Sequence, residues 1–322
     1  MSNLSWCIMG SGYIAKEWII AIKMMNYNSI AIVGRNPSTV CELAKSFSVT
    51  GVVGLQNKST NKLIGNADVI IVATSIESTR QTIEAALKSK KDGSVIICEK
   101  PGYDFQESIG DAILNSSYEH PDVYIAYNRR FYSNMNLARV ELRKLVDSSY
   151  DIICKAGISE NFAEIDVNKF SMNVADGWVL ANTIHVIDML NYLLSTVGCD
   201  LYKQLGGLSI DWGCRNSFRL EMKSGRVLQL ELECHTHRPG WYISFFGGGT
   251  QISFAPLERL KIVDSKGSRE ISEASQIKPG YLNMVKAINC GDFEKFEASQ
   301  SNIRKLQMVD MIFNTYCGHR AR

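Results

Sequence analysis

The sequence predicts an α/β protein with two parts: a doubly wound parallel sheet at the amino-terminal end, then an α+β part with a large, open and mostly antiparallel sheet. Three observations support this prediction. Short apolar runs alternate with helical stretches as far as residue 122, a glycine turn joins the first such pair, and later segments alternate apolar and polar residues. The length of 322 residues suits roughly two domains.

The predicted parallel strands are short runs rich in Ile and Val: residues 4–9, 29–33, 69–73 and 95–98. Each run is apolar almost throughout, which is typical of strands buried on both faces. Between them, residues 14–25 and 78–90 place apolar side chains at helical spacing. Alternation of strand and helix implies right-handed crossovers, and therefore a doubly wound sheet.

The pattern changes after the last predicted parallel strand, residues 123–127. Residues 218–222 and 227–233 alternate apolar and polar side chains, as strands do when one face is buried and the other is solvated. Lys223-Ser224-Gly225-Arg226 is the predicted hairpin turn between them. We expect residues 1–122 to form the first domain and residues 123–322 the second, with a final helix at about 301–316 packing back on the first domain.

The composition argues against several classes of protein. There are 35 Lys and Arg residues against 33 Asp and Glu, a balance that disfavours nucleic-acid and anionic-membrane partners. The longest apolar runs are far shorter than the roughly 20 residues that span a bilayer. The 9 cysteines contain no Cys-x-x-Cys pair, so we expect reduced thiols in a cytoplasmic protein.

A glycine turn, Gly10-x-Gly12-x-x-Ala15, follows the first predicted strand and opens the first helix. In a dinucleotide-binding turn, the residue at Gly10 allows the sharp bend, Gly12 lets a pyrophosphate approach, and Ala15 keeps the helix close to the sheet. The helix amino terminus then offers N–H groups to the phosphates. An incidental glycine turn is the alternative, but the strand–turn–helix context favours dinucleotide binding.

The end of the second strand indicates which dinucleotide binds. Gly34 stands where NAD-binding proteins usually carry an acidic residue, and the cationic Arg35 follows. A guanidinium attracts a 2′-phosphate that a carboxylate would repel, so we expect NADP, with NAD as the alternative. A solvated turn arginine is the other interpretation. The predicted cofactor-binding residues lie in these turns and strand ends: Gly10, Gly12, Tyr13, Ile14, Ala15, Gly34, Arg35, Asn36, Thr74, Ser75, Glu99 and Lys100.

Five motifs occur in the order, and at about the spacing, of one protein family. They are Gly10-x-Gly12-x-x-Ala15, Ala73-Thr74-Ser75, Glu99-Lys100-Pro101, Tyr127-Asn128-Arg129-Arg130-Phe131 and a helix bearing His185-Val186-Ile187-Asp188. On these motifs the whole chain resembles the glucose–fructose oxidoreductase/inositol dehydrogenase/MocA (Gfo/Idh/MocA) family.

The resemblance implies a Rossmann domain joined to an α/β domain whose large sheet serves as the interface of a homodimer or homotetramer. It also implies NAD(P)-dependent oxidation or reduction of a sugar, cyclitol or nucleotide sugar. In the family, the lysine of Glu-Lys-Pro contacts the reacting oxygen and the helix histidine exchanges the proton, which assigns these roles to Lys100 and His185. An ammonium stabilises an alkoxide-like oxygen, and an imidazole titrates near neutral pH. We expect the two groups to converge on one substrate atom.

Four residues are predicted to bind substrate: Asn182, Arg130, Asp176 and Tyr127. Many relatives carry an Asp four residues before the histidine, where this chain has Ala181; Thr79 and Ser133 also depart from the family pattern. The missing acid leaves two alternatives open. One is a reductase of an imine or a conjugated double bond, and the other is an NADP-binding regulatory protein without catalysis.

Three other features have competing interpretations. Arg129 and Arg130 suit either an anionic substrate group or an interdomain ion pair. The segment His235 to Trp241 resembles a metal or sugar-binding loop, but no cysteine or carboxylate cluster nearby completes a metal set, so we expect no metal. A sugar-facing rim formed by His237, Arg238 or Trp241 competes with plain sheet-edge residues. We expect Asp188 to be structural.

Overall fold

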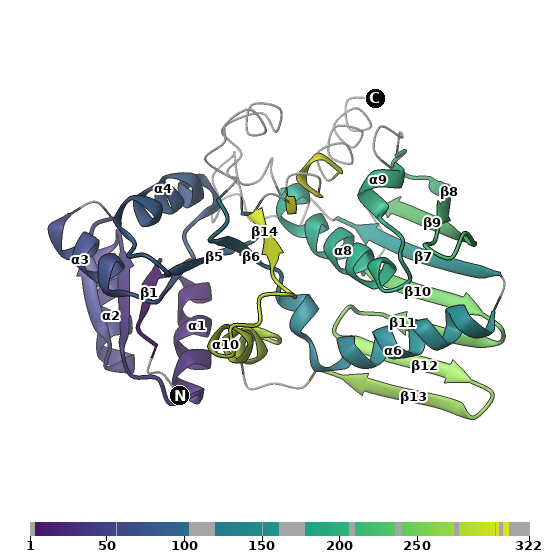
Figure 1. The fold of residues 1–322 in the computed structure, drawn as a ribbon, viewed down its shortest axis with the longest axis horizontal. Helices are drawn as coiled ribbons and strands as arrows, with labels where there is room; N and C mark the ends of the chain where they lie inside the picture. Colours follow the sequence, from purple (N-terminus) through teal and green to yellow (C-terminus); the bar gives the residue numbers. More distant parts are fainter. Residues whose placement is uncertain are drawn as a thin grey trace. The chain divides into compact units, whose positions relative to one another are not determined.

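The computed structural model describes residues 4–55, 57–102, 120–149, 151–160, 178–205, 210–235, 240–273, 277–299, 301–302 and 305–308, with the backbone alone for 178–181. The chain divides into two compact units (Figure 1). The first unit comprises Met1–Phe131 and Ser275–Ile303, and the second comprises Tyr132–Ala274 and Arg304–Arg322.

The first unit is built on a seven-stranded sheet with the order β14-β6-β5-β4-β1-β2-β3. Its six parallel strands are β1 (Trp6–Met9), β2 (Ile30–Gly34), β3 (Thr50–Val53), β4 (Val69–Val72), β5 (Val95–Glu99) and β6 (Val123–Ala126). The short β14 (Glu297–Ala298) pairs antiparallel with β6. Strands β1, β2 and β4 are buried along their whole length, which agrees with their apolar sequences and confirms the predicted doubly wound parallel sheet.

The domain division differs from the expected boundary at residue 122. Because β6 pairs with β5, it belongs to the first unit together with the 3-10 turn η3 (Asn128–Phe131). Residues 275–303 also return to this unit, although they lie far along the chain. Of the predicted helix at 301–316, only residues 301–302 and 305–308 are described, and both stretches are helical.

The helices of the first unit are α1 (Tyr13–Met24), α2 (Pro37–Phe47), α3 (Lys58–Asn66), α4 (Thr79–Ser89) and α10 (Tyr281–Asn289), with a 3-10 turn η1 (Ile76–Ser78) before α4. Helix α2 begins where Asn36 accepts hydrogen bonds from the backbone N–H groups of Ser38 and Thr39, with Pro37 at its first position. Helix α10 packs beside α1, and Tyr281 meets Trp18 edge to face at 5.1 Å between ring centroids.

The second unit contains a seven-stranded sheet with the order β13-β12-β11-β10-β7-β9-β8. Its strands are β7 (Ile152–Ser159), β8 (Arg215–Glu221), β9 (Val227–His235), β10 (Tyr242–Gly247), β11 (Thr250–Phe254), β12 (Arg259–Asp264) and β13 (Gly267–Ser272). All neighbours are antiparallel except β7 and β9. Burial alternates along β9, so the predicted open and mostly antiparallel sheet is confirmed.

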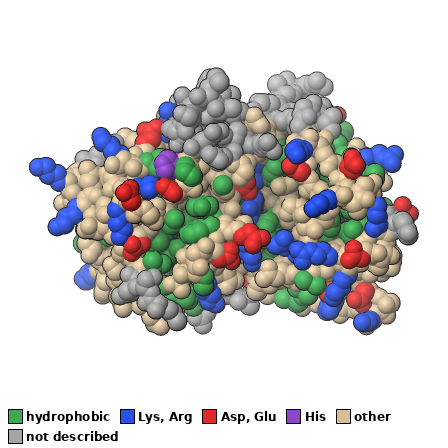
Figure 2. Space-filling view, in the orientation of Figure 1, with side chains coloured by type: hydrophobic (Ala, Val, Ile, Leu, Met, Phe, Trp, Pro, Cys, Tyr) green, Lys and Arg blue, Asp and Glu red, His purple; other side chains and the backbone are tan. Residues whose placement is uncertain are grey.

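Helices α6 (Ser133–Ser148) and α8 (Trp178–Ser195) cover one face of this second sheet, and α9 (Leu201–Leu205) lies beside α8 (Figure 1). Side chains of both charges are interspersed over the visible surface (Figure 2), in keeping with the net charge of +2. Within the described ranges, no helix is long and apolar enough to cross a membrane.

Candidate active site

The predicted cofactor residues come from separate segments and meet at one edge of the first sheet. Met9 lies in register with Val33 of β2 and Val72 of β4, and Val72 lies in register with Cys98 of β5. The turns that follow these four strands therefore leave the sheet at the same edge. In doubly wound sheets, this carboxyl edge is where ligands bind.

Gly10 is required by the backbone of the protein itself. Its φ is 142°, in a region that favours glycine, and its N–H donates to the carbonyl of Val33 at 2.7 Å. A Cβ at this position would lie 2.2 Å from the carbonyl oxygen of Ala73. Only glycine lets β1 and β4 end this close together.

Gly12 differs, because among the described residues nothing lies within 4 Å of a Cβ added there. It is the N-cap of α1, and no side-chain hydrogen bond caps that helix in the described part of the chain. A helix amino terminus with open space in front of it can receive a phosphate group. Behind it Ala15 is fully buried, whereas Tyr13 is exposed.

The end of β2 combines a cation with two hydroxyl groups. The Arg35 side chain is exposed and its Nη2 donates to Ser75 Oγ at 3.4 Å. Ser11 Oγ lies 2.7 Å from Thr39 Oγ1, and a Cβ on Gly34 would come within 2.6 Å of the same Ser11 oxygen. The absence of a side chain at Gly34 therefore allows Ser11 to approach Thr39 beside Arg35.

The Glu99-Lys100-Pro101 motif leaves the same edge at the end of β5. The carboxylate oxygen Oε1 of Glu99 accepts hydrogen bonds from Trp18 Nε1 at 2.8 Å and from the hydroxyl of Tyr281 at 2.7 Å. Glu99 was predicted to bind the cofactor, but these bonds direct its carboxylate to α1 and α10. The Lys100 side chain is half-buried, and the Lys100–Pro101 peptide is cis.

Tyr127 and Arg130, which are predicted to bind substrate, make their observed contacts inside the first unit. Tyr127 is 1% exposed and donates to Asn302 Oδ1 at 2.7 Å. Arg130 is 5% exposed, donates to the carbonyl of Lys295 at 3.3 Å and pairs closely with Glu297 of β14. The Arg130–Glu297 ion pair thus lies within the first unit.

His185 lies on α8 in the second unit and is 7% exposed. Its ring centroid is 6.3 Å from that of Trp241, whose Nε1 donates to the carbonyl of Ser159 at 2.9 Å. Asn182, one turn earlier on α8, is half-buried. Asp176, His237 and Arg238 lie outside the described residues, as does the side chain of Ala181.

Asp188 and His235, which the sequence also singles out, both contact charged side chains of the second unit. Asp188 is 1% exposed and pairs with the fully buried Lys305, which suits a structural role. At the end of β9, His235 Nε2 lies 3.4 Å from Glu233 Oε2. No group of three or more metal-ligating side chains occurs among the residues that the structure describes.

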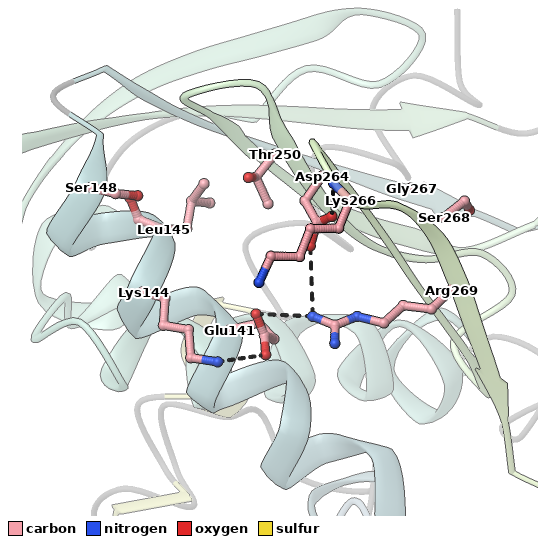
Figure 3. Close-up of a pocket in the computed structure, with 10 residues that line it drawn as sticks. All are labelled: Glu141, Lys144, Leu145, Ser148, Thr250, Asp264, Lys266, Gly267, Ser268 and Arg269. Carbon is pink, nitrogen blue, oxygen red and sulfur yellow. Dashed lines mark hydrogen bonds and ion pairs between the residues drawn. The ribbon is translucent and has the colours of Figure 1, made fainter.

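The second unit has a pocket with a volume of about 370 Å³ between α6 and the β12–β13 hairpin (Figure 3). Glu141 is 2.9 Å from the Lys144 ammonium and 3.2 Å from the Arg269 guanidinium, which also pairs with Asp264 at 3.8 Å. These charges largely compensate one another, and none of the predicted site residues lines this pocket.

Residues 4–108 match the family model described as an oxidoreductase family with an NAD-binding Rossmann fold, GFO_IDH_MocA. The amino-terminal Rossmann part of the chain thus matches the Gfo/Idh/MocA oxidoreductase family. The match covers the glycine turn, β2, β4 and the Glu-Lys-Pro motif. A comparison with curated proteins finds no significant match.

Solved structures share the fold of this chain over nearly its whole length. A levoglucosan dehydrogenase in complex with NADH and L-sorbose is 16% identical, with a TM-score of 0.67 and coverage of 98% of this chain and 97% of that one. UDP-N-acetylglucosamine 3-dehydrogenase GnnA from Acidithiobacillus ferrooxidans is 14% identical, with a TM-score of 0.63 and coverage of 98% of each chain.

Biliverdin reductase from Synechocystis sp. PCC 6803, in complex with biliverdin and NADP+, is 15% identical, with a TM-score of 0.60. That match covers 98% of this chain and 100% of the reductase. Identities this low show a common fold. In this chain, the close approach at Gly10, the open space at Gly12 and the amino terminus of α1 fit the pyrophosphate of a nicotinamide dinucleotide.

Proposed function

We propose that the protein is an NADP-preferring oxidoreductase that acts on a carbinol or keto carbon of a sugar, cyclitol or nucleotide sugar. The observation that carries this proposal is the placement of Lys100. It follows β5 at the same sheet edge as the glycine turn and the amino terminus of α1. The dehydrogenases of levoglucosan and of UDP-N-acetylglucosamine, which share the fold, support the substrate class.

A bound nicotinamide supplies the carbon that accepts or donates hydride. The Lys100 ammonium stabilises negative charge on the substrate oxygen, and the His185 imidazole takes or returns the proton. Asn182 orients the substrate from α8, because an amide can donate and accept hydrogen bonds but cannot act as a base. We assign Arg130 a structural role, because its guanidinium pairs with Glu297.

The preference for NADP rests on the end of β2. The Arg35 guanidinium and the hydroxyls of Ser11, Thr39 and Ser75 can donate hydrogen bonds to a 2′-phosphate. No acidic residue occurs between Gly34 and Thr39 to repel that phosphate.

Turnover tests the catalytic assignment. The purified protein is offered UDP-N-acetylglucosamine, myo-inositol, D-glucose and levoglucosan with NADP+ or NAD+, and formation of the reduced cofactor is followed by absorbance. Lys100→Ala is expected to lower kcat at least about a hundredfold and to leave the Kd of NADPH nearly unchanged. Wild-type turnover by Lys100→Ala would exclude Lys100 as the catalytic group.

Cofactor choice is tested separately by titrating NADPH and NADH into three proteins. Arg35→Ala is expected to weaken NADPH binding about tenfold or more and to leave NADH binding unaltered. Lys45→Ala, which removes an exposed cation near the other end of α2, should bind both cofactors as the wild type does. Equal affinity of the wild type for NADPH and NADH would contradict the preference.

A second candidate function is reduction of an imine or a conjugated double bond on the same scaffold. Ala181 in place of the usual acid favours it, and a biliverdin reductase in complex with biliverdin and NADP+ shares the fold. Biliverdin and a cyclic imine offered with NADPH separate this function from the first. Oxidation of NADPH by either compound, with no turnover of any sugar, would favour it.

We also propose that the protein is cytoplasmic and forms a homodimer or homotetramer through the open face of the second sheet. This face is polar: Arg215, Glu231 and Lys155 pair across neighbouring strands. An interface built on such charges should weaken as salt rises. Light scattering after gel filtration at low and high salt measures the subunit number, and a monomer at both would contradict it.

A further inference from the structure

Lys100 is flanked by two residues that are tied to the interior of the first unit. On its amino side, the Glu99 carboxylate accepts hydrogen bonds from Trp18 and Tyr281 at 2.8 and 2.7 Å. On its carboxyl side, the carbonyl of Pro101 accepts a 2.9 Å hydrogen bond from Asn302 Nδ2. The backbone N–H of Gly102 donates back to the carbonyl of Glu99 at 3.0 Å and closes the turn.

The groups that hold this turn are themselves enclosed. Trp18 is 0% exposed and Tyr281 is 1% exposed, and their rings contact edge to face. Asn302 is 2% exposed, and its Oδ1 accepts a hydrogen bond from the buried Tyr127. Because water reaches none of these three donors, the hydrogen bonds to the turn face no competition from solvent.

The Tyr281 phenol keeps its proton beside the Glu99 carboxylate. Burial raises the pKa of Tyr281, and the neighbouring Glu99 carboxylate raises it further, so the phenol stays a hydrogen-bond donor. The Lys278 ammonium lies 5.6 Å from the Tyr281 ring centroid. The backbone N–H of Lys278 donates to the Glu17 carboxylate at 2.7 Å. Burial lowers the pKa of Lys278, while the attraction of Glu99 acts in the opposite direction.

We propose that Trp18, Tyr281 and Asn302 are positioning residues, which hold the turn from Glu99 to Pro101 so that Lys100 meets the substrate oxygen. This inference rests on the proposed function, in which Lys100 contacts that oxygen. The physical reason is geometric: displacing a catalytic group by about 1 Å can slow a reaction about a hundredfold. None of the three has to touch the substrate.

Tyr281→Phe is the decisive variant because it removes one hydroxyl and retains the buried ring. Tyr27→Phe is its matched control. Tyr27 is also buried in the first unit, and its hydroxyl donates to Asn289 at the opposite end of α10. Asn302→Asp is a second variant, which keeps the acceptor for Tyr127 but removes the donor to Pro101.

Two measurements distinguish positioning from a merely structural role. Hydrogen exchange of the peptide that contains residues 99–102 is followed by mass spectrometry, and it needs no substrate. Exchange is expected to accelerate about tenfold in Tyr281→Phe and Asn302→Asp and to stay at the wild-type rate in Tyr27→Phe. The effect of Tyr281→Phe on kcat is then measured in the wild-type protein and in Lys100→Ala, with the sugar of the four-compound panel that is turned over fastest. Tyr281→Phe should lower kcat about tenfold in the wild-type protein and should not lower it further in Lys100→Ala.

Exchange at 99–102 that remains unchanged in both Tyr281→Phe and Asn302→Asp would overturn the positioning proposal. An equal loss of kcat from Tyr281→Phe in both backgrounds would also overturn it. In that case the low kcat of Lys100→Ala would still support the proposed function. Wild-type turnover by Lys100→Ala alone is a different result, since it would remove the role of Lys100 and with it the reason to position it.

Discussion

Lys305 and Asp188 form an ion pair that solvent does not reach. The ammonium lies 2.5 Å from the carboxylate, and the two side chains are 0% and 1% exposed. Asp188 lies on α8, three residues after His185, and Lys305 lies in the helical residues 305–308. An enclosed charge of either sign depends on its partner, because neither group is solvated.

Removing one member of this pair should therefore destabilise the second unit strongly. Asp188→Asn is expected to lower the free energy of unfolding by about 3–5 kcal/mol, whereas joint replacement by Asp188→Leu and Lys305→Met should cost less. Urea unfolding followed by circular dichroism measures both. Lys144→Met is the control. The Lys144 ammonium is 66% exposed, and its partner Glu141 keeps a second cation, Arg269, at 3.2 Å, so this loss should cost about 0–1 kcal/mol. Equal effects of Asp188→Asn and Lys144→Met would contradict this account.

The two glycines of the turn after β1 should respond differently to the same substitution. Gly10→Ala places a methyl 2.2 Å from the Ala73 carbonyl at a positive φ, and we expect a loss of at least about 2 kcal/mol in stability. Gly12→Ala meets no described atom within 4 Å, so the melting temperature should stay within about 2 °C of the wild type.

The Kd of NADPH completes this comparison. The methyl of Gly12→Ala fills the space into which we place the pyrophosphate, so the folded variant should bind NADPH at least about tenfold more weakly. Calorimetric titration measures this Kd, and thermal unfolding measures the stability of both variants. A Gly12→Ala protein with wild-type affinity would mean that the cofactor phosphates lie elsewhere.

Local sequence patterns were sufficient to predict both sheets. The wholly apolar runs at β1, β2 and β4 are buried on both faces, and β9 alternates as its sequence does. Gly10 was also predictable, because a turn with a positive φ favours glycine at that one position. Such features depend on neighbours in the sequence or on the backbone alone.

Side-chain partners could not be predicted in this way, since they are chosen by the folded chain. Trp18 and Tyr281 are 81 and 182 residues from Glu99, and Glu297 is 167 residues from Arg130. A tryptophan or tyrosine on an apolar helix face carries no sign of the carboxylate that it will contact. For the same reason, the arginine that sequence assigned to substrate binding is used to hold β14.

Arg130 should accordingly behave as a structural residue. Arg130→Met leaves the Glu297 carboxylate, 12% exposed, without this cation, and we expect about 2–4 kcal/mol lower stability. The KM for the panel sugar should change less than about twofold. A double-mutant cycle measured by urea unfolding tests the pair. Glu297→Gln should lower the free energy of unfolding less in the Arg130→Met background than in the wild type. A large rise in KM with unaltered stability would restore Arg130 to substrate binding.

Glu233 on the second sheet should make stability depend on acid pH. Burial acts to raise the pKa of its carboxyl, but hydrogen bonds from Tyr242, Arg215 and His235 outweigh burial and hold that pKa below the usual 4.5. The Tyr242 hydroxyl and the Arg215 Nε lie 3.0 and 2.9 Å from its oxygens. The native state therefore favours the ionised form more than the unfolded chain does.

The sign of the effect follows from this difference. Where the folded pKa is lowered, the stabilisation is complete above the unfolded pKa and is lost as the pH falls through the folded pKa. Glu233→Gln should thus be less stable than the wild type at pH 7 and should lose less stability between about pH 5 and pH 3. Urea midpoints measured across this range test it, with Glu270→Gln as the control, because Glu270 is 46% exposed and lies 3.5 Å from Arg259. Parallel pH curves for wild type and Glu233→Gln would mean that this carboxylate does not govern the acid limb, even though its hydrogen bonds are formed.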